Sequence, residues 1–292
     1  MNRRQWNKLM LGSLAAMAMP KFGKAGMEEG FASPEKAAGV VLGLQSYSLR
    51  DRSLEDAIKA MTELGVQSCE LWSGHLEPRR LKAAELSKWR LETPLDTFAN
   101  ARALFDKAGI RLSAFNAGFR NQMTDEEMDR IFLMAKAMKL KTITTSTTVD
   151  ITPRLDKFAQ KHKIVVGLHN HDRFEDKNEF SNRDSFERGL KGVSKYMAIN
   201  LDIGHFVAAN EDPVDFIRQY HQRIVMIHVK DRKKDHGANL PFGEGQTPIK
   251  EVLLLMKQNR YRFPANIEYE YKGADTVEEI RKCLQYCKDI LA

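Results

Sequence analysis

Short apolar runs alternate with amphipathic stretches along most of this chain, and the alternation constrains its fold more than any other feature. Beyond residue 39 we identify runs typical of buried strands at residues 40–47, 66–72, 110–118, 141–146, 164–171, 198–205, 224–231 and 265–271. Strands that alternate with helices predict parallel β/α units, because parallel strands need a crossover connection. Eight such units in about 250 residues predict a closed (β/α)8 TIM barrel, a single α/β domain over residues 40–292.

Capping residues mark the helices between these strands. Ser53 precedes an amphipathic stretch over residues 54–64, and Thr124 precedes another over residues 125–139 that begins with acids and ends with lysine. Ser and Thr side chains accept hydrogen bonds from free backbone N–H groups, and such end charges complement the helix dipole. We predict a further helix at the end of the chain, over residues 275–291.

The first 24 residues have a composition unlike the rest of the chain. Five cations and no acid occur there, and an apolar run over residues 9–19 follows the pair Arg3 and Arg4. This run is too short to span a bilayer of about 30 Å but has the length of a signal-peptide core. The basic pair resembles a twin-arginine export signal. We predict a signal peptide over residues 1–24, a linker over residues 25–39 and a periplasmic protein without a membrane span; an uncleaved anchor or a basic tail is the alternative.

The net charge gives little support for a nucleic-acid partner. It is +7 for the whole chain but falls to +2 without residues 1–24, and a surface that follows phosphates needs a stronger basic excess. Residues 243–245 lack the helix-opening context of a phosphate-binding loop, so we expect no nucleotide cofactor. The expected partner is a small-molecule sugar, and the sequence is compatible with a homo-oligomer.

Side chains of a barrel strand point alternately outward to the helices and inward to the lumen. Applied to five of the runs, this rule sends a polar set into the lumen near the carboxyl ends of the strands: Glu70, Trp72, His169, His171, Asn200, Asp202, His228, Lys230, Asn266, Glu268 and Glu270. In the seventh run Val225, Ile227 and Val229 form the outward face. Active sites of such barrels lie at the carboxyl ends of the strands, so the convergence predicts an active site.

The inward set is rich in groups that bind metals. Its imidazoles and carboxylates include His169, His228, Glu70, Asp202, Glu268 and Glu270. Carboxylates buried together repel one another, and a divalent cation offsets that repulsion. Mixed nitrogen and oxygen ligands suit Mn²⁺, Co²⁺, Zn²⁺ or Fe²⁺ better than Ca²⁺. We therefore predict one divalent metal that polarises a carbonyl group while a base removes the adjacent proton.

A series of segments in a fixed order gives a closer identification. They are GLQSYSLRD (43–51), CELWSGH (69–75), HNHDRFE (169–175), NLDIGH (200–205), IHVKD (227–231), FGEGQTP (242–248) and IEYE (267–270). In this order they resemble the sugar phosphate isomerase/epimerase family, xylose isomerase-like TIM barrels that include D-tagatose 3-epimerase and inosose dehydratase. The resemblance implies one metal held at the ends of strands five to eight by His169, Asp202, His228 and Glu268, with Glu270 as the alternative to Glu268. It also implies that His205 contacts the substrate.

The other polar residues at the predicted mouth receive catalytic or binding roles. We assign catalytic roles to Glu70, His205, Lys230 and Glu270, and substrate contacts to Trp72, His75 and His171. Glu70 would act as a base or accept a hydrogen bond from a sugar hydroxyl, and the alternative is a structural, buried carboxylate paired with a neighbouring lysine. Lys230 would contact an oxyanion or pair with Asp231, and His171 is the alternative to His169 as a ligand. We predict a solvated loop over residues 232–236.

These assignments predict an isomerase or epimerase that acts on a sugar through an enediolate. The sugar is expected to be non-phosphorylated, because sugar phosphates are not expected in the periplasm. The alternative is a lyase that performs β-elimination on a 3-keto sugar or 3-keto glycoside. His169 favours the lyase, because the resemblance places it where tagatose-type epimerases carry one of two catalytic glutamates. An apurinic endonuclease and a non-catalytic sugar-binding protein are the rival classes.

Overall fold

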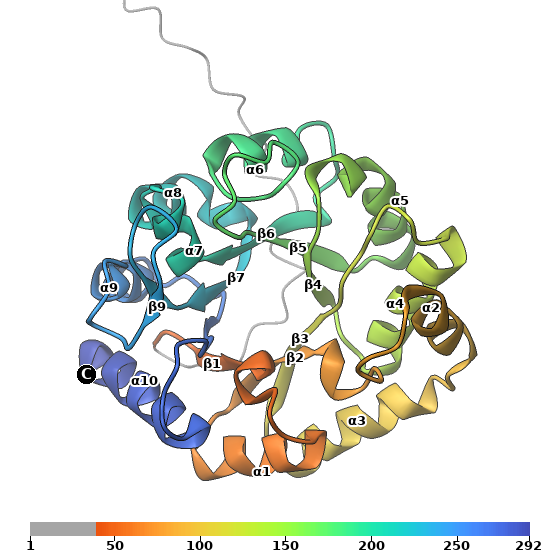
Figure 1. The fold of residues 1–292 in the computed structure, drawn as a ribbon, viewed down its shortest axis with the longest axis horizontal. Coiled ribbons are helices and arrows are strands. Elements are labelled where there is room, and N and C mark those ends of the chain that lie inside the picture. Colours follow the sequence, from red (N-terminus) through yellow and green to blue (C-terminus); the bar gives the residue numbers. More distant parts are fainter. Residues whose placement is uncertain (1–38) are drawn as a thin grey trace, which may run out of the picture.

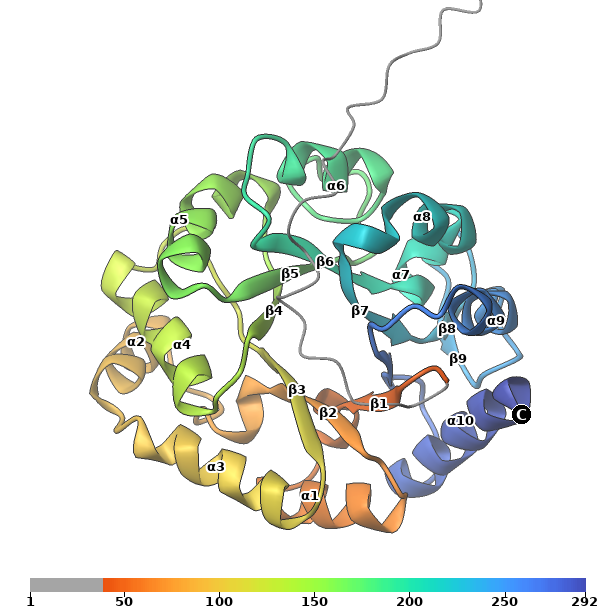
Figure 2. The same cartoon turned by 180° about the vertical axis from the view of Figure 1, so that it is seen from behind.

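The structure, a computed structural model, describes residues 39–292, so the predicted signal peptide and the linker up to residue 38 lie outside the described residues. The described strands of the closed parallel barrel are β1 (Leu42–Gln45), β2 (Ser68–Trp72), β3 (Arg111–Asn116), β4 (Thr142–Ser146), β5 (Val165–His169), β6 (Met197–Asp202), β7 (Ile224–Val229) and β10 (Ala265–Ile267). Figures 1 and 2 view this ring along its axis from opposite ends, with helices packed around it. The predicted TIM barrel is confirmed.

The barrel closes by pairing its first strand with its last. β1 pairs with β2 on one side and with β10 on the other, where Leu44 lies opposite Ile267. The remaining strands follow one another in sequence order around the ring. Every predicted run overlaps one of these strands, although the strands are shorter because the chain leaves the sheet at its polar carboxyl ends.

Helices cover the outside of the barrel within residues 39–292. They are α1 (Leu54–Glu63), α2 (Ala83–Glu92), α3 (Asp96–Lys107), α4 (Asp125–Ala137), α5 (Thr152–His162), α6 (Arg183–Leu190), α7 (Ile203–Ala208), α8 (Pro213–Tyr220), α9 (Ile249–Asn259) and α10 (Thr276–Leu291), with short 3-10 helices η2 (Ser46–Leu49), η3 (Ser73–His75), η4 (Val149–Ile151) and η5 (His221–Arg223). The predicted caps are present: Ser53 accepts a hydrogen bond from the backbone of Asp56, and Thr124 accepts one from the backbone of Glu127.

The chain departs from the predicted strand limits after β6 and β7. The sequence predicts a strand to residue 205, but β6 ends at Asp202, whose side chain accepts a hydrogen bond from the backbone of His205 and starts α7. After β7, strands β8 (Asp231–Arg232) and β9 (Asn239–Leu240) form a small antiparallel hairpin that was not among the predicted elements. Both departures lie at the carboxyl ends of barrel strands and help to build the mouth.

Buried apolar side chains form two sets, one on each side of the barrel wall. The larger set lies between strands and helices and includes fully buried rings such as Phe98, Phe115, Phe132, Phe186 and Phe216. The smaller set fills part of the lumen with Ala114, Val165, Ala198, Val225 and Met226. The lumen is thus a packed interior, and the polar residues above it rest on an apolar floor.

Val225 belongs to the lumen, so the prediction that it faces the helices is wrong. The pairing of β6 with β7 skips one residue between Ile224 and Met226. This bulge shifts the alternation of side chains by one position. A Cβ atom on Gly167 would lie 2.9 Å from Val225 Cγ2, so a glycine is needed at that point of the lumen.

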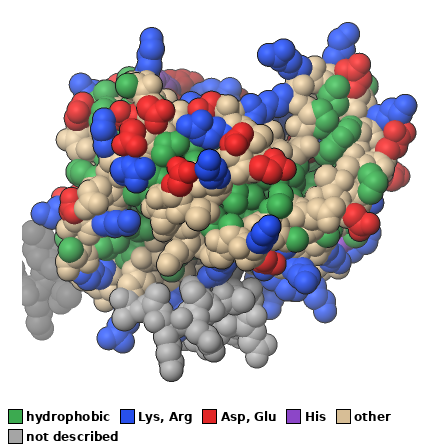
Figure 3. Space-filling view, turned by 90° about the horizontal axis from the view of Figure 1, so that it is seen from below, with side chains coloured by type: hydrophobic (Ala, Val, Ile, Leu, Met, Phe, Trp, Pro, Cys, Tyr) green, Lys and Arg blue, Asp and Glu red, His purple; other side chains and the backbone are tan. Residues whose placement is uncertain are grey.

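The outer surface mixes charges of both signs. Figure 3 shows Lys and Arg interspersed with Asp and Glu around hydrophobic side chains on one side of the barrel. The large hydrophobic residues with the greatest exposure are Leu81 and Leu91, before and near the end of α2. Among the described residues, no helix combines the length and the apolar character needed to cross a membrane.

Candidate functional site

The four predicted metal ligands meet at the carboxyl ends of four barrel strands. His169 ends β5, Asp202 ends β6, His228 lies in β7 and Glu268 follows β10. Each offers one ligand atom, and these atoms all lie within 4.8 Å of one another. All four residues are buried. They converge because inward side chains at neighbouring strand ends point into the same space.

One buried polar atom of each of these four residues lacks a hydrogen bond. The atoms are His169 Nδ1, Asp202 Oδ2, His228 Nδ1 and Glu268 Oε2. The two oxygens lie near the charge of Lys230 Nζ, at 3.1 and 3.0 Å, whereas the two nitrogens lack any hydrogen bond. Buried polar atoms are nearly always paired in folded proteins, so these converging atoms could share a further partner. Two imidazole nitrogens and two carboxylate oxygens fit a divalent transition metal, and these residues could therefore hold one.

Glu70 contacts the opposite side of the His228 ring. Glu70 Oε2 accepts a hydrogen bond from His228 Nε2 at 2.6 Å, while His228 Nδ1 lies 3.2 Å from Glu268 Oε2. Burial by itself lowers the pKa of His228, but the charges of Glu70 and Glu268 outweigh burial and raise that pKa well above its usual value. A metal at Nδ1 would replace a proton there, while Nε2 would keep its proton for Glu70.

The surroundings of Glu70 do not suit the catalytic role expected from the sequence. The side chain is fully buried, and its oxygens also accept hydrogen bonds from Asn266 Nδ2 at 3.1 Å, from Asn200 Nδ2 at 3.4 Å and from the Thr144 hydroxyl. A base must reach its substrate, whereas these contacts occupy the carboxylate beneath the cluster. The contact with His228 suits a carboxylate that positions this ring, and among the described residues no lysine pairs with Glu70, unlike the structural alternative.

Lys230 brings a buried positive charge to the cluster. Its Nζ lies 3.1 Å from Asp202 Oδ2 and 3.0 Å from Glu268 Oε2, at angles that do not suit hydrogen bonds, and it donates to Glu270 Oε2 at 2.6 Å. Burial lowers the pKa of Lys230, but the three carboxylates outweigh burial and raise that pKa well above its usual value. Asp231, the alternative partner, instead accepts hydrogen bonds from the backbone of the following loop.

Two histidines of the mouth have lowered pKa values. Burial lowers the pKa of His169 well below its usual value, and the charge of His228 adds to that effect. Burial also lowers the pKa of His205, and the charge of Lys230 adds to it. Lys230 Nζ lies 3.1 Å from His205 Nε2. Neutral imidazoles retain the lone pair that binds a metal or accepts a proton.

His171 lies beside the cluster and is oriented by a carboxylate. Its Nδ1 lies 2.5 Å from Glu179 Oε1, and Arg173 Nη2 donates to the other oxygen of Glu179 at 2.8 Å. Burial raises the pKa of Glu179, but the contacts with His171 and Arg173 outweigh burial and lower it. The ring centroids of His171 and His169 are 5.2 Å apart. The Nε2 atom has no hydrogen-bond partner in the described part of the chain.

The β8–β9 hairpin is tied to the loop that follows β5. Arg232 Nη2 donates to Asp172 Oδ2 at 3.0 Å and to the carbonyl oxygen of Gly237 at 2.7 Å. Contact with His205 and with Arg232 holds the pKa of Asp172 well below its usual range. Arg232 is only 7% exposed, so the prediction of a solvated loop over residues 232–236 is wrong at its first residue. The hairpin buries this side chain, and the sequence did not predict the hairpin.

The other predicted substrate contacts lie outside the four-residue cluster: Trp72 ends β2 and His75 ends η3. The Trp72 ring packs edge-on against Tyr47 and His75, with centroids 5.0 and 5.6 Å apart. His75 Nε2 lies 3.0 Å from the carbonyl oxygen of Ser46, and burial lowers the pKa of His75. Trp72 also lines a cavity above β2, β3 and β4.

Several residues that shape the site were absent from the predicted set. Glu179 lies in a loop eight positions after His171, and no periodic pattern marks such a position. Asn170 joins β5 to β6, because it bonds both the backbone N–H and the carbonyl oxygen of Asp202. Asp172 directly follows the His-Asn-His segment, and this position in the sequence could have indicated that it belongs to the site.

Comparisons with known proteins agree with the geometry. A sequence model of the xylose isomerase-like TIM barrel family matches residues 45–290. Inosose dehydratase of Mesomycoplasma hyopneumoniae (strain J) is 23% identical over 300 residues, covering 83% of this chain and 90% of the relative.

Solved structures with the same fold include a zinc-bound IolI protein and the 3-keto-D-glucoside 4-epimerase YcjR of E. coli. The IolI structure has a TM-score of 0.65 and 15% identity, and covers 85% of this chain and 97% of its own. The YcjR structure has a TM-score of 0.63 and 12% identity, and covers 86% of this chain and 99% of its own.

Proposed function

The chain belongs to the xylose isomerase-like TIM barrel family, and we propose that it is a metal-dependent enzyme that removes a proton next to the carbonyl group of a non-phosphorylated sugar. The observation that carries this proposal is the placement of an imidazole oriented by a carboxylate, His171 with Glu179, beside the four-residue cluster. The relatives include a dehydratase and an epimerase, and both reactions begin with such a proton transfer.

The proposed metal ligands are His169, Asp202, His228 and Glu268. A bound divalent metal would polarise the carbonyl oxygen and stabilise the negative charge left by proton removal. Zinc has the support of the zinc-bound IolI neighbour, and the same donors suit Mn²⁺, Co²⁺ or Fe²⁺.

His171 is the base in this proposal. Because Glu179 holds Nδ1, the lone pair at Nε2 is free to take the proton from the carbon next to the carbonyl. A positioned base of this kind typically contributes about 10²- to 10⁴-fold to the rate. Lys230 Nζ, whose pKa is raised by three carboxylates around it, stays protonated and can stabilise an oxyanion that develops at the mouth.

This arrangement favours β-elimination, the second of the two reactions expected from the sequence. The base takes the proton, and a hydroxyl or alkoxyl group on the next carbon leaves and gains a proton, so a carbon–carbon double bond forms beside the carbonyl. Epimerisation by two bases needs a second free base, but Glu70 is fully buried and Glu270 is paired with Lys230. Both ring nitrogens of His205 are also occupied, by Lys230 and Arg232. The inosose dehydratase relative supports this choice.

Isomerisation or epimerisation is the second candidate reaction. A single base can return the proton to a neighbouring carbon or to the other face of a mobile intermediate. The fold shared with the E. coli 3-keto-D-glucoside 4-epimerase favours this candidate. Both candidates start from the same proton removal, so one experiment separates them.

The proposal of a non-phosphorylated substrate rests on the export signal predicted for residues 1–24. We propose that the protein is periplasmic. Cell fractionation with N-terminal sequencing would test this, and a shortened chain in the periplasmic fraction is the expected result. An uncleaved chain in the cytoplasm would bring sugar phosphates back as candidate substrates.

Proton NMR of the metal-loaded protein in deuterium oxide tests the reaction. The panel contains aldoses, ketoses, 3-keto glucosides and a keto-cyclitol. Loss of a hydroxyl or aglycone with a new enone signal would establish the lyase. Deuterium next to the carbonyl with all substituents retained would establish the isomerase or epimerase. Sugar binding without deuterium uptake would refute both and leave a binding protein.

A further inference from the structure

A cavity of about 570 Å³ lies over the carboxyl ends of β2, β3 and β4. Its walls include Trp72, Arg79, Arg90, Asn116, Arg120 and Ser146. Ligand pockets of roughly 300–1,000 Å³ hold small molecules, so the cavity has room for part of a sugar derivative. Three of the lining residues are arginines, and their partners indicate which kind of ligand the cavity could bind.

The three arginines differ in their partners. Arg90 is buried and neutralised, since it bonds Glu77 Oε1 at 2.7 Å and Glu127 Oε1 at 2.9 Å. Arg79 donates only to carbonyl oxygens of the main chain, as does Arg120. Neither forms an ion pair within residues 39–292. Both are exposed, and the Arg79 guanidinium also lies over the Trp72 ring, 5.1 Å from its centroid. Two guanidinium groups without a carboxylate partner therefore border one cavity.

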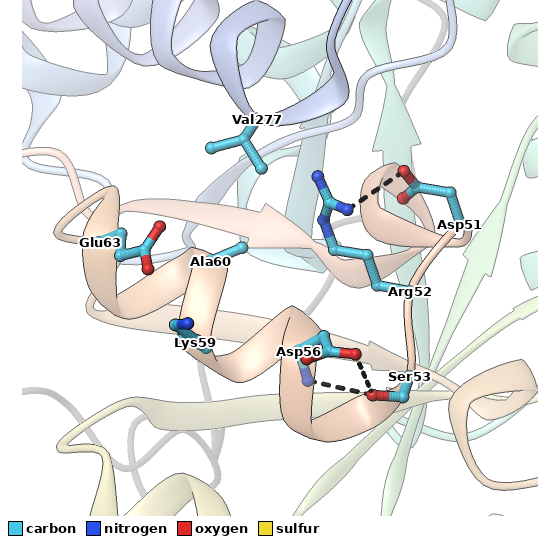
Figure 4. A pocket seen from close by; sticks show the side chains of 8 residues that line it. All are labelled: Asp51, Arg52, Ser53, Asp56, Lys59, Ala60, Glu63 and Val277. Atoms are coloured by element: carbon cyan, nitrogen blue, oxygen red, sulfur yellow. Dashed lines mark hydrogen bonds and ion pairs between the residues drawn. The ribbon is translucent and has the colours of Figure 1, made fainter.

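A second pocket, above α1, provides a contrast (Figure 4). There Arg52 Nη1 lies 3.5 Å from Asp51 Oδ2, and the Ser53 hydroxyl bonds Asp56 at 2.8 Å. Lys59 shares that pocket with further acidic side chains. In the cavity above β2, β3 and β4 the lining residue Glu77 pairs with Arg90. Arg79 and Arg120 have no such acidic partner there, in contrast to the basic groups in the pocket of Figure 4.

The cavity adjoins the metal cluster through the barrel wall and mouth. Ser146, in its wall, is the register partner of His169 across β4 and β5, and paired strands lie only about 5 Å apart. Asn116, also in its wall, lies 3.5 Å from Glu70 Oε1. A substrate with its carbonyl at the cluster could therefore extend a substituent toward Arg79 and Arg120.

The electrostatics of Arg120 agree with a missing anionic partner. Partial burial lowers the pKa of Arg120 from its usual value, and the charges of Arg90 and Arg173 add to the effect, although Glu179 opposes it. A guanidinium group stabilises carboxylate and phosphate oxygens through paired N–H donors. An anion beside Arg120 would offset the repulsion from Arg90 and Arg173.

We infer that this cavity binds an anionic oxygen group on the substrate, the chemistry shared by a sugar carboxylate and a sugar phosphate. The inference rests on the proposed function, because it places the carbonyl of the same substrate at the cluster. It extends that function by giving the substrate a charged end, away from the reacting carbons. Arg79 and Arg120 are then specificity-determining residues.

Equilibrium titration of the metal-loaded protein tests this inference. The probes are D-glucose, D-glucuronate and D-glucose 6-phosphate, measured at low salt with the wild type, the double variant Arg79→Gln/Arg120→Gln and the control Arg52→Gln. We expect at least one charged probe to bind about tenfold or more tighter than glucose in the wild type and the control. The double variant should bind charged and neutral probes alike.

The carboxylate and phosphate probes identify the source of the anion. Preference for either supports the inference, and preference for the phosphate would refute the restriction of the proposed function to non-phosphorylated sugars. Equal binding of charged and neutral probes by the wild type, or an unchanged preference in the double variant, would overturn it. Deuterium uptake by a wild type that binds charged and neutral probes equally would overturn the inference and leave the proposed function standing. A charge preference lost in the double variant, without deuterium uptake, would refute the proposed function and keep the anion site.

Discussion

Replacement of Glu70 by glutamine should weaken metal binding without removing the catalytic base. The buried carboxylate accepts a hydrogen bond from His228 Nε2 at 2.6 Å, on the side of the ring opposite the proposed metal. Loss of such an outer partner typically weakens metal binding about 10- to 100-fold, or about 1.4–2.7 kcal/mol. We expect Glu70→Gln to lie in this range.

An opposing effect gives the prediction a pH dependence. Glu70 and Glu268 raise the pKa of His228, so in the wild type a metal must displace a proton from this ring, and metal affinity falls as the pH falls. In Glu70→Gln the pKa of His228 is lower and less proton displacement is needed. The affinity gap between variant and wild type should therefore be wider at about pH 9 than at about pH 6.

Competition with a chelating dye measures the affinity for Zn²⁺ or Mn²⁺ at both pH values. The matched control is Glu127→Gln, which changes a buried carboxylate that bonds Arg90 and Ser87 outside the cluster, and it should bind metal like the wild type. With metal at saturation, Glu70→Gln should regain most of its turnover. Unchanged metal affinity together with lost turnover would refute the positioning role and restore Glu70 as the base.

Further perturbations test the ligands, the base and the core. His228→Ala should abolish stoichiometric metal binding in elemental analysis, and full retention would contradict the ligand assignment. His171→Gln should lower kcat about 10²- to 10⁴-fold while metal affinity stays unchanged; a variant that turns over at the wild-type rate would eliminate His171 as the base. Phe115 of β3 is fully buried and packs against Phe98 of α3. Phe115→Ala should lower the free energy of unfolding, measured in urea, by about 3–5 kcal/mol, and a loss below about 1 kcal/mol would contradict its place in the core.

The fold was accessible from the sequence because its signals are local. An apolar run or a capping residue determines the structure only of residues a few positions away. The structure confirms the strands predicted from the runs and the caps at Ser53 and Thr124. The bulge that turns Val225 into the lumen depends on how β7 pairs with β6. The β8–β9 hairpin likewise depends on contacts with a distant loop. The pattern of one sequence contains no information about strand pairing or about contacts with distant loops.

The site was accessible only in part, for a similar reason. His169, Asp202, His228 and Glu268 lie at strand ends with inward alternation, so parity and resemblance suffice to group them. The depth of Glu70 beneath the cluster follows from the asparagine and threonine side chains around it. Glu179 owes its position to a loop conformation, and sequence spacing could not assign it to His171.

Closure of the barrel by its last strand has a consequence for synthesis of the chain. A nascent chain that ends before residue 265 has an unpaired side on β1 and on β7, and it also lacks Glu268. Unpaired strand edges recruit strands from other molecules. Pairing of β10 therefore closes the barrel against aggregation and brings in the last of the four candidate metal ligands. A prematurely terminated chain would be prone to aggregate and would lack one of these ligands.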